Sequence, residues 1–487
     1  MDKSFAIECP PFEVTLSHWD RILPPIHTKR ILCFSLPTGS QKQQLVEYLH
    51  IAFHNTIQRV PFLAGSVIPF PEDQGGRPWI KNIIPKGTAQ LIIKDLSDKM
   101  SFSELAKANF SQHLLHTELL CPLPEIGYFT DEPIDICHFQ ANFVKGGLLL
   151  VESIIHNISD GRGNTEVLEV FANELCKAQA GQTGYPLEMR TSLYRSDRTA
   201  VLSGHGVPGD IDMHDAWTST PFSTHSQLQN VKNSCRTFHI STEALSSLKK
   251  ILTTASRGPD DWFSTNDAIS GFIWRSIMVA RHRAGLIGAD VPTYVAQPID
   301  CRPHLKIPKP YFGNAIYMTQ SSLPLSILQQ PESGVAAGAR ALRADIKTMT
   351  AERMRDLVGY VERTSLEAHT RMAILEYMAT SGIILSSLFK MGLHSIDFGP
   401  ALGDHIKALR LPATGTPAGA IIVLPMLPDG SCQFMITEQE STIRCLLDDE
   451  FFSRHTNDES AYAGYLEQPD TASSPKSSPT EDRRSML

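Results

Sequence analysis

The sequence predicts an α/β protein with mixed sheets, built as two domains of similar size. Its 487 residues exceed what one core holds, because hydrophobic cores stop growing at roughly 250–300 residues. Strand and helix patterns alternate along both halves of the chain. Between about Pro186 and Lys232 the hydrophobic pattern disappears, and Ser, Thr, Gly, Pro and Asp dominate. The predicted domains are therefore residues 1–185 and 233–467, joined by a crossover linker over residues 186–232.

Each element follows from its own pattern of apolar residues. Apolar runs predict strands over Lys29–Leu36, Leu148–Ile155 and Cys235–Ser241. Near the end of the chain, "AGAIIVLPML" and "SCQFMIT" predict a hairpin whose turn is "PDG". Apolar residues at helical spacing predict helices over Gln43–Val60, 164–179, 241–252 and 264–285. Asn164 or Thr165 is the expected N-cap of the second helix. Ser264 is the expected cap of the last one, with Asp267 favouring its first turn.

The composition excludes several classes of function. The net charge is −8 and the sequence pI is about 6.1, so the basic footprint of a nucleic-acid-binding protein is missing. Nine cysteines are spread without zinc or redox spacing, which favours free thiols in a reducing compartment. The N-terminal residues lack the apolar region of a secretory signal, and no apolar run approaches the ~18 residues of a membrane span. We expect a cytoplasmic protein without a membrane partner, ending in a disordered polar tail over residues 468–487.

One cluster of residues carries candidate chemistry. The strand Leu148–Ile155 runs directly into His156, and Asp160 follows within a turn that Gly161 and Gly163 make easy. Histidine is the most frequent general base in enzymes, and a carboxylate so close can orient the loop or the ring. Because this spacing also arises by chance, a core histidine beside a surface aspartate is the alternative interpretation.

Three other motifs are rejected on their context. "GHGVPG" (Gly204–Gly209) fits G-x-G-x-x-G, but it follows no strand and contains Pro208, so it predicts a turn and no dinucleotide site. His50 and His54 have ligand spacing on a helix, but a third ligand and the H-E-x-x-H pattern are missing, so no metal site is predicted. The D-F-G at Asp397–Gly399 lacks the other motifs of a kinase, and the G-x-S-x-G of a serine hydrolase is absent from the sequence.

The motifs together resemble one family. "HNISDG" (His156–Gly161) resembles the H-x-x-x-D-G motif of the BAHD acyltransferases, and "DFGPA" (Asp397–Ala401) resembles their D-F-G-W-G. Four further segments resemble family sequences in the same order: "RVPFLAGSV", "GGLLLVESIIHNISDG", "STNDAISGFIWRSI" and "DCRPHLKIPKPYFGNAIY". The agreement extends from about Phe12 to about Phe452. The Pro-Ala ending of the second motif is typical of the fungal branch, which includes the trichothecene acetyltransferases.

The resemblance implies a fold and a reaction. The fold is chloramphenicol-acetyltransferase-like, in two similar domains with the active site in a channel between them. The reaction transfers an acyl group from acyl-CoA, with acetyl-CoA as the expected donor, to a hydroxyl of a small-molecule secondary metabolite. No bound cofactor or metal is implied, since acyl-CoA is a co-substrate. A monomer is expected, because the interface between the two domains already supplies the cleft.

The resemblance also implies roles for individual residues. His156 would act as the general base, and the hydroxyl of Ser386 would donate to the oxyanion. Structural or orienting roles are implied for Asp160, Gly161, Arg302, Asp397 and Gly399. Contacts to substrate are implied for Asn314 and Leu388, and contacts to the CoA phosphates for Lys306 and Lys309. Asp160 is expected to point away from the substrate and to form an ion pair with Arg302.

One departure from the family pattern leaves the acceptor open. Where the family has T-S-W, this chain has Ser386-Ser387-Leu388, so Leu388 replaces a tryptophan that often lines the acceptor pocket. The sequence leaves two other functions open. A condensation-type enzyme would take its acyl group from a carrier protein, but such enzymes usually show two adjacent histidines, and Ile155 precedes His156 here. A catalytically silent relative would only bind its ligands.

Overall fold

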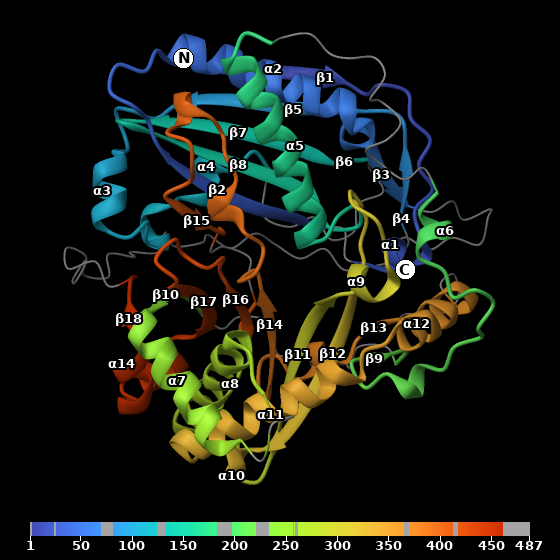
Figure 1. The fold of residues 1–487 in the computed structure, drawn as a ribbon, viewed down its shortest axis with the longest axis vertical. Helices are drawn as coiled ribbons and strands as arrows, with labels where there is room; N and C mark the ends of the chain where they lie inside the picture. The colour runs from blue at the N-terminus through green and yellow to red at the C-terminus, as the bar shows by residue number, and fades with distance from the viewer. Residues whose placement is uncertain are drawn as a thin grey trace, which may run out of the picture.

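The computed structural model describes residues 2–23, 26–69, 81–123, 133–182, 197–220, 233–256, 258, 262–364, 370–412 and 417–460. Two large sheets dominate it, one in the upper and one in the lower half of Figure 1. Each mixes parallel and antiparallel neighbours, and each is covered by helices. The predicted α/β class with mixed sheets in two domains is therefore confirmed.

The first sheet has six strands. Across the sheet these are β1 (Lys3–Glu8), β5 (Thr88–Asp95), β7 (Cys137–Val144), β8 (Gly147–Ile155), β2 (His27–Ser35) and β15 (Ala408–Arg410). Side chains on both faces of β8 are buried: Leu148 and Leu150 pack under α2 (Lys42–Arg59) and α5 (Gly161–Gln179), and Leu149 and Val151 under α3 (Phe102–Lys107) and α4 (Thr117–Leu120). This burial explains why the β8 sequence is apolar at nearly every position.

The second sheet has seven strands. In order these are β12 (Ile316–Pro324), β11 (Pro292–Asp300), β14 (Gly382–Ser387), β16 (Ala420–Val423), β17 (Cys432–Gln439), β10 (Asn233–Ile240) and β18 (Asn457–Asp458). One face packs against α7 (Thr242–Ala255), α8 (Thr265–Arg283), α10 (Leu325–Leu328), α11 (Pro331–Thr348), α13 (Glu440–Leu447) and α14 (Glu450–His455). The other face of β11 and β12 packs against α12 (Ala351–Thr364). Ser264 caps α8 in a capping box with Asp267, as predicted.

The smaller elements lie outside the two large sheets. They are α1 (His18–Ile22), β3 (Ser66–Pro69), β4 (Lys81–Ile84), β6 (Ile134–Asp135), α6 (Arg198–Val201), β9 (Trp217–Thr218), α9 (Arg302–Leu305) and β13 (Arg371–Met372). Trp19 of α1 packs edge-on against Trp217 of β9, with ring centroids 4.8 Å apart. The first sequence domain and the crossover segment therefore share one hydrophobic cluster with the second sheet.

One strand of the first sheet comes from the second half of the sequence, which was not predicted. Strand β15 belongs by sequence to the second domain, yet it pairs antiparallel with β2, with Arg410 opposite Ile31. The chain thus leaves the second sheet after β14, adds an edge strand to the first sheet and returns to form β16 (Figure 1). The predicted limits 1–185 and 233–467 do not include this exchange. Much of the predicted linker, and the predicted tail 468–487, lie outside the described residues.

Several expectations from the sequence can be compared directly with the structure. Residues 204–209 form turns that open no helix. His50 stacks on Phe5 with ring centroids 4.1 Å apart, and the described part of the chain contains no metal-ligand cluster. All nine cysteines are free thiols. Among the helices of the described residues, none is both long and apolar enough to cross a membrane.

Candidate active site

His156 is the first residue after β8, where the sequence placed it. Its backbone N donates to the carbonyl of Ile26 at 2.8 Å, and its own carbonyl accepts from Nδ2 of Asn314 at 2.8 Å. The residue is half-buried, and its Nδ1 is buried without a hydrogen-bond partner. Nε2, which makes no hydrogen bond either, reaches the surface. The backbone of His156 is thus fixed on both sides, while one ring nitrogen is free to meet a ligand.

Asp160 begins helix α5, which corrects the sequence prediction. Its Oδ1 accepts from the backbone N of Arg162 at 3.1 Å and of Gly163 at 2.9 Å, so Asp160 is the N-cap and the helix starts at Gly161. Asn164 and Thr165, the predicted caps, are the fourth and fifth residues of the helix. A carboxylate at this position accepts hydrogen bonds from N–H groups that have no partner within the helix. Its negative charge also interacts favourably with the positive end of the helix dipole.

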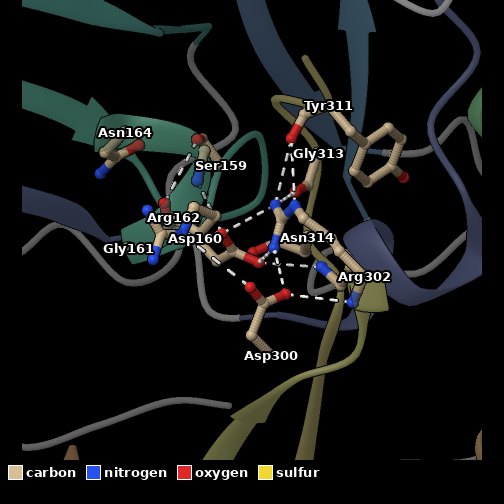
Figure 2. Close-up of polar contacts among 12 residues, drawn as sticks. Ser159, Asp160, Gly161, Arg162, Asn164, Asp300, Arg302, Tyr311, Gly313 and Asn314 are labelled. Carbon is tan, nitrogen blue, oxygen red and sulfur yellow. Dashed lines mark hydrogen bonds and ion pairs between the residues drawn. The ribbon is translucent and has the colours of Figure 1, made fainter. Parts of the chain in front are cut away.

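The same carboxylate forms the expected ion pair with Arg302 (Figure 2). The Asp160 Oδ1 lies 2.9 Å from Arg302 Nη2, and its Oδ2 lies 3.0 Å from Arg302 Nη1. The backbone N of Ala315 donates to Oδ2 at 2.9 Å. Both charged side chains are buried. Burial by itself raises the pKa of the Asp160 carboxyl, but Arg302 and the backbone N–H donors outweigh burial and hold that pKa below its usual value.

Arg302 makes further contacts within the second domain. Its guanidinium donates to the carbonyls of Tyr311, at 3.1 Å, and of Gly313, at 2.6 Å, and to Asp300 Oδ1 at 3.1 Å (Figure 2). The segment Tyr311–Asn314 is thereby folded against the loop that carries His156. Both oxygens of the Asp160 carboxylate are engaged by protein donors and leave no free edge for a substrate, and the orienting role of Asp160 stays a prediction.

Gly163 is required by a close approach of two backbones. A Cβ at this position would lie 2.4 Å from the carbonyl oxygen of Phe312 and 2.4 Å from Oγ of Ser159. Such distances are far shorter than any real Cβ contact, and the carbonyl cannot move without displacing the Tyr311–Asn314 segment. At Gly161 there is more room, since the nearest atoms are Cε of Met391 at 3.3 Å and Cδ2 of Leu388 at 3.5 Å.

We expect Gly163→Ala to destabilise the protein although the position is helical. Gly→Ala in a helix normally stabilises by about 0.4–1 kcal/mol, whereas here overpacking should cost about 1–3 kcal/mol. The measurement is the free energy of unfolding in urea. Gly338→Ala in helix α11 is the matched control, because its Cβ would meet nothing closer than 3.4 Å, an ordinary van der Waals contact. Equal effects of the two substitutions would show that the approach of the Phe312 carbonyl places no constraint on the site.

The loop after His156 is anchored by residues that the sequence analysis did not find. Nδ2 of Asn157 donates to the carbonyls of Asp20, at 3.3 Å, and of Leu23. Nη1 of Arg198 donates to the carbonyl of Ile158 at 2.8 Å. The Ser-x-x-Asp pattern that ends at Asp20 is a capping-box signal and could have marked that segment as a helix start. Nothing local in the sequence marks Arg198.

Asn314 lies beside His156 but is fully buried. Its Nδ2 donates to Asp20 Oδ1 at 2.9 Å as well as to the His156 carbonyl. Its Oδ1 is buried without a partner. The contacts of Asn314 are therefore to protein groups, and the predicted contact to substrate stays a prediction.

Ser386 and Leu388 lie where β14 approaches the first domain. Leu388 packs into the core of that domain, next to Gly161. Ser386 is half-buried and pairs in register with Ile422 of β16. Its hydroxyl makes no hydrogen bond with the described residues and reaches the surface. The end of β14 therefore meets the start of α5 at the junction of the domains, and the hydroxyl of Ser386 is available there.

Asp397 and Gly399 lie in a loop that docks on the last turn of α5. The Asp397 side chain is exposed and accepts from the backbone N of Gly399 at 2.8 Å. Gln179 holds the loop from the helix side: its Nε2 donates to the carbonyl of Phe398 at 2.7 Å and its Oε1 accepts from the N of Ala401 at 2.8 Å. Gly399 has a φ of +81°, which only glycine adopts readily. These contacts agree with a structural role for the loop.

Lys306 and Lys309, the predicted phosphate contacts, are both exposed near the end of α9. The structure offers a second pair of lysines in a cavity of about 580 Å³ between α7, the start of α8 and the end of β14. Lys249, Lys250, Thr265 and Phe389 are among its lining residues. Phe389 directly follows Leu388 in the sequence, so one wall of this cavity begins next to the domain junction. Lys306 and Lys309, in contrast, lie near the end of α9.

Relatives of known name match this chain over most of its length. A family model described as the trichothecene 3-O-acetyltransferase-like N-terminal domain matches residues 26–176. The trichothecene 3-O-acetyltransferase of Fusarium sporotrichioides is 25% identical over 441 residues, which are 88% of this chain and 93% of that protein. A Penicillium crustosum protein named enoyl-CoA isomerase/hydratase is 70% identical over 459 residues, which are 94% of this chain and 52% of that protein. This chain thus spans about half the length of that relative.

Solved structures share the fold. The structure of the F. sporotrichioides acetyltransferase complexed with coenzyme A and T-2 matches with a TM-score of 0.77 at 23% identity, covering 92% of this chain and 100% of that one. Vinorine synthase matches with a TM-score of 0.62 at 15% identity, covering 94% and 100%. The fold is therefore that of the BAHD acyltransferases. Residues 26–176 match the trichothecene 3-O-acetyltransferase-like family model, and the F. sporotrichioides acetyltransferase is similar over most of the chain.

Proposed function

We propose that this protein is an O-acyltransferase that moves an acyl group, expected to be acetyl, from acyl-CoA to a hydroxyl of a secondary metabolite. The observation that carries the proposal is His156, half-buried at the end of β8 with one ring nitrogen at the surface and a loop anchored from distant parts of the chain. A general base needs this combination of access and rigidity. The relatives support the proposal, since several are named O-acetyltransferases and one solved relative is complexed with coenzyme A.

The proposed reaction proceeds through a ternary complex. Nε2 of His156 takes the proton of the acceptor hydroxyl while that oxygen attacks the thioester carbonyl. The resulting oxyanion accepts a hydrogen bond from the hydroxyl of Ser386, a kind of contact worth on the order of 10²–10³ in rate. The C–S bond then breaks, and His156 returns the proton to the leaving thiolate. No acyl-enzyme is needed, because the thioester is already activated.

The remaining predicted residues take supporting roles in this proposal. Asp160 and Arg302 hold the His156 loop against the Tyr311–Asn314 segment. Gly161 lets the end of β14 approach α5, and the Asp397–Gly399 loop clamps the other end of that helix. Leu388, which replaces the family tryptophan, is proposed to shape the acceptor pocket.

The donor phosphates are proposed to bind in the cavity beside α7. The cavity offers two ammonium groups, the start of helix α8 and the side chain of Phe389 near the domain junction. A helix N-terminus and nearby lysines favour phosphate groups. Lys249 already donates to the carbonyl of Phe263, which leaves Lys250 as the more available ammonium group.

We expect Lys250→Ala to raise the KM for acetyl-CoA by about tenfold with little change in kcat, the loss of one charge-assisted hydrogen bond. Steady-state kinetics with acetyl-CoA as the varied substrate is the measurement. Lys306→Ala and Lys309→Ala serve as comparison variants, because they test the pair predicted from the sequence. A raised KM in those two variants, with Lys250→Ala unchanged, would move the phosphate site to the end of α9.

A second candidate function comes from the relative at 70% identity, which is named an enoyl-CoA isomerase/hydratase. The part of that protein that matches this chain is about half of it. Isomerisation or hydration of an enoyl-CoA keeps the thioester intact and releases no thiol, whereas acyl transfer releases free CoA. A carrier-protein donor and a silent binding protein are the further alternatives.

Release of free CoA thiol is the test of the proposal. Acetyl-CoA is incubated with the protein, with and without a pooled extract of fungal alcohols, and mass spectrometry of the extract identifies the product. Thiol release that requires the extract supports acyl transfer. Conversion of crotonyl-CoA without thiol release would support the isomerase/hydratase function instead. A monomeric state and a cytoplasmic location stay predictions, which sedimentation and fluorescence microscopy would test.

A further inference from the structure

Helix α1 contains a fully buried carboxylate, Asp20, that the proposed mechanism does not use. Its Oδ2 faces its own helix, where it accepts from the backbone N of Ser17 at 3.1 Å and from Ser17 Oγ at 2.8 Å. Its Oδ1 faces away from the helix and accepts from the backbone N of Asn314 at 3.0 Å and from Asn314 Nδ2 at 2.9 Å. One carboxylate therefore joins a local helix cap to a residue far along the chain.

The contact to Asn314 leads directly to His156. Nδ2 of Asn314 has two hydrogens, and the second one is donated to the carbonyl of His156 at 2.8 Å. With the amide reversed, its oxygen would face two acceptors, the Asp20 carboxylate and the His156 carbonyl. The charge of Asp20 thus selects the amide orientation that supports the backbone of His156.

The next two residues of the loop are tied to the same place. Nδ2 of Asn157 donates to the carbonyl of Asp20. Arg198 Nη1 lies 3.6 Å from Asp20 Oδ1 and donates to the carbonyl of Ile158. Residues 156, 157 and 158 are therefore each held by Asp20 or by a group that lies against it.

The local cap does not account for this arrangement. Burying a carboxylate is unfavourable, and the cap of a five-residue helix needs only the contacts between Asp20 and Ser17. We propose that Asp20 is a positioning residue for His156, acting through Asn314 and Arg198 to fix the backbone of residues 156–158 and hence the direction of the imidazole. The consequence for rate rests on the proposed function, whereas the consequence for the geometry of His156 does not.

The kinetic test compares Asp20→Asn with Ser17→Ala. Asp20→Asn keeps the shape but cannot satisfy both sets of donors, so kcat should fall by about 10- to 100-fold with both KM values within about twofold. Ser17→Ala removes only the local side of the cap and should lower the melting temperature while keeping kcat. Because Asp20 acts partly through Asn314, Asp20→Asn should cause a smaller loss of kcat in an Asn314→Ala background, where only the route through Arg198 remains. Equal losses in both backgrounds, or an unchanged kcat, would overturn the proposal.

A second readout is independent of activity. In protein with ¹³C-labelled histidine Cε1, the signal of His156 is assigned by its loss in His156→Ala. We expect Asp20→Asn to shift this signal and Ser17→Ala to leave it in place. An unmoved signal in folded Asp20→Asn overturns the positioning role, whereas a moved signal in a protein that transfers no acyl group overturns the proposed function alone. If Asp20→Asn does not fold, Asn314→Ala, which keeps the Ser17 side of the cap, must shift the signal for the proposal to stand.

Discussion

His156→Ala is expected to lower kcat for acyl transfer by about 10²–10⁴-fold, the usual contribution of a general base. This corresponds to about 2.7–5.5 kcal/mol of transition-state stabilisation. The fold should be little affected, because the imidazole makes no hydrogen bond and only the backbone of His156 is anchored. The measurement is thiol release from acetyl-CoA at saturating acceptor, together with the melting temperature.

The control for this variant is His54→Ala. His54 is exposed on α2, far along the chain from the site, and its loss should change neither kcat nor the melting temperature. Turnover that survives in His156→Ala would contradict general-base catalysis by this residue. Accumulation of an acylated protein in the wild type, seen by intact mass, would contradict the ternary-complex mechanism.

The position of His156 could be predicted because it depends on a local pattern. Leu148–Ile155 is apolar at nearly every position, since β8 is buried on both faces, and the end of this run fixes where the histidine lies. The cap of α5 was wrongly placed for an equally local reason. The apolar stripe of the helix begins only at Val167, and the two glycines of its first turn look like a loop in the sequence. Only the structure shows that Asp160 already caps at that point.

The remaining contacts of the site could not be derived from local patterns. Strand β15 has three residues, too few for a periodic pattern to show. Its pairing with β2 in the first sheet could therefore not be predicted from the sequence. Asp20, Arg198 and Asn314 meet the His156 loop only through tertiary structure. The ion pair of Asp160 with Arg302 was expected solely because the motifs resembled a family. Long-range polar contacts among buried groups leave no periodic pattern in a sequence, so this part of the site is visible only in the folded structure.

Asp160→Asn is expected to destabilise the protein by about 3–5 kcal/mol, because it removes the buried charge partner of Arg302 and leaves that guanidinium with only the exposed carboxylate of Asp300. The loss should appear as a lower midpoint of urea unfolding. The matched control is Asp95→Asn, which breaks the exposed ion pair with Lys42 and should cost at most about 1 kcal/mol. Similar costs for the two variants would show that the buried pair contributes no more than a surface pair.

The pH dependence of this loss has a definite sign. The folded pKa of Asp160 lies below its unfolded value, so the unfolded state binds the proton more readily and the pair stabilises the fold above the unfolded pKa, near 3.9. The difference in unfolding free energy between wild type and Asp160→Asn should therefore be complete at neutral pH and should shrink as the pH falls below about 4. If the difference in unfolding free energy stays constant from pH 7 down to pH 3, the substitution destabilises the protein through lost hydrogen bonds at the helix cap and not through the lost charge. Activity should fall together with stability, because the carboxylate that binds Arg302 also begins the helix directly after the His156 loop.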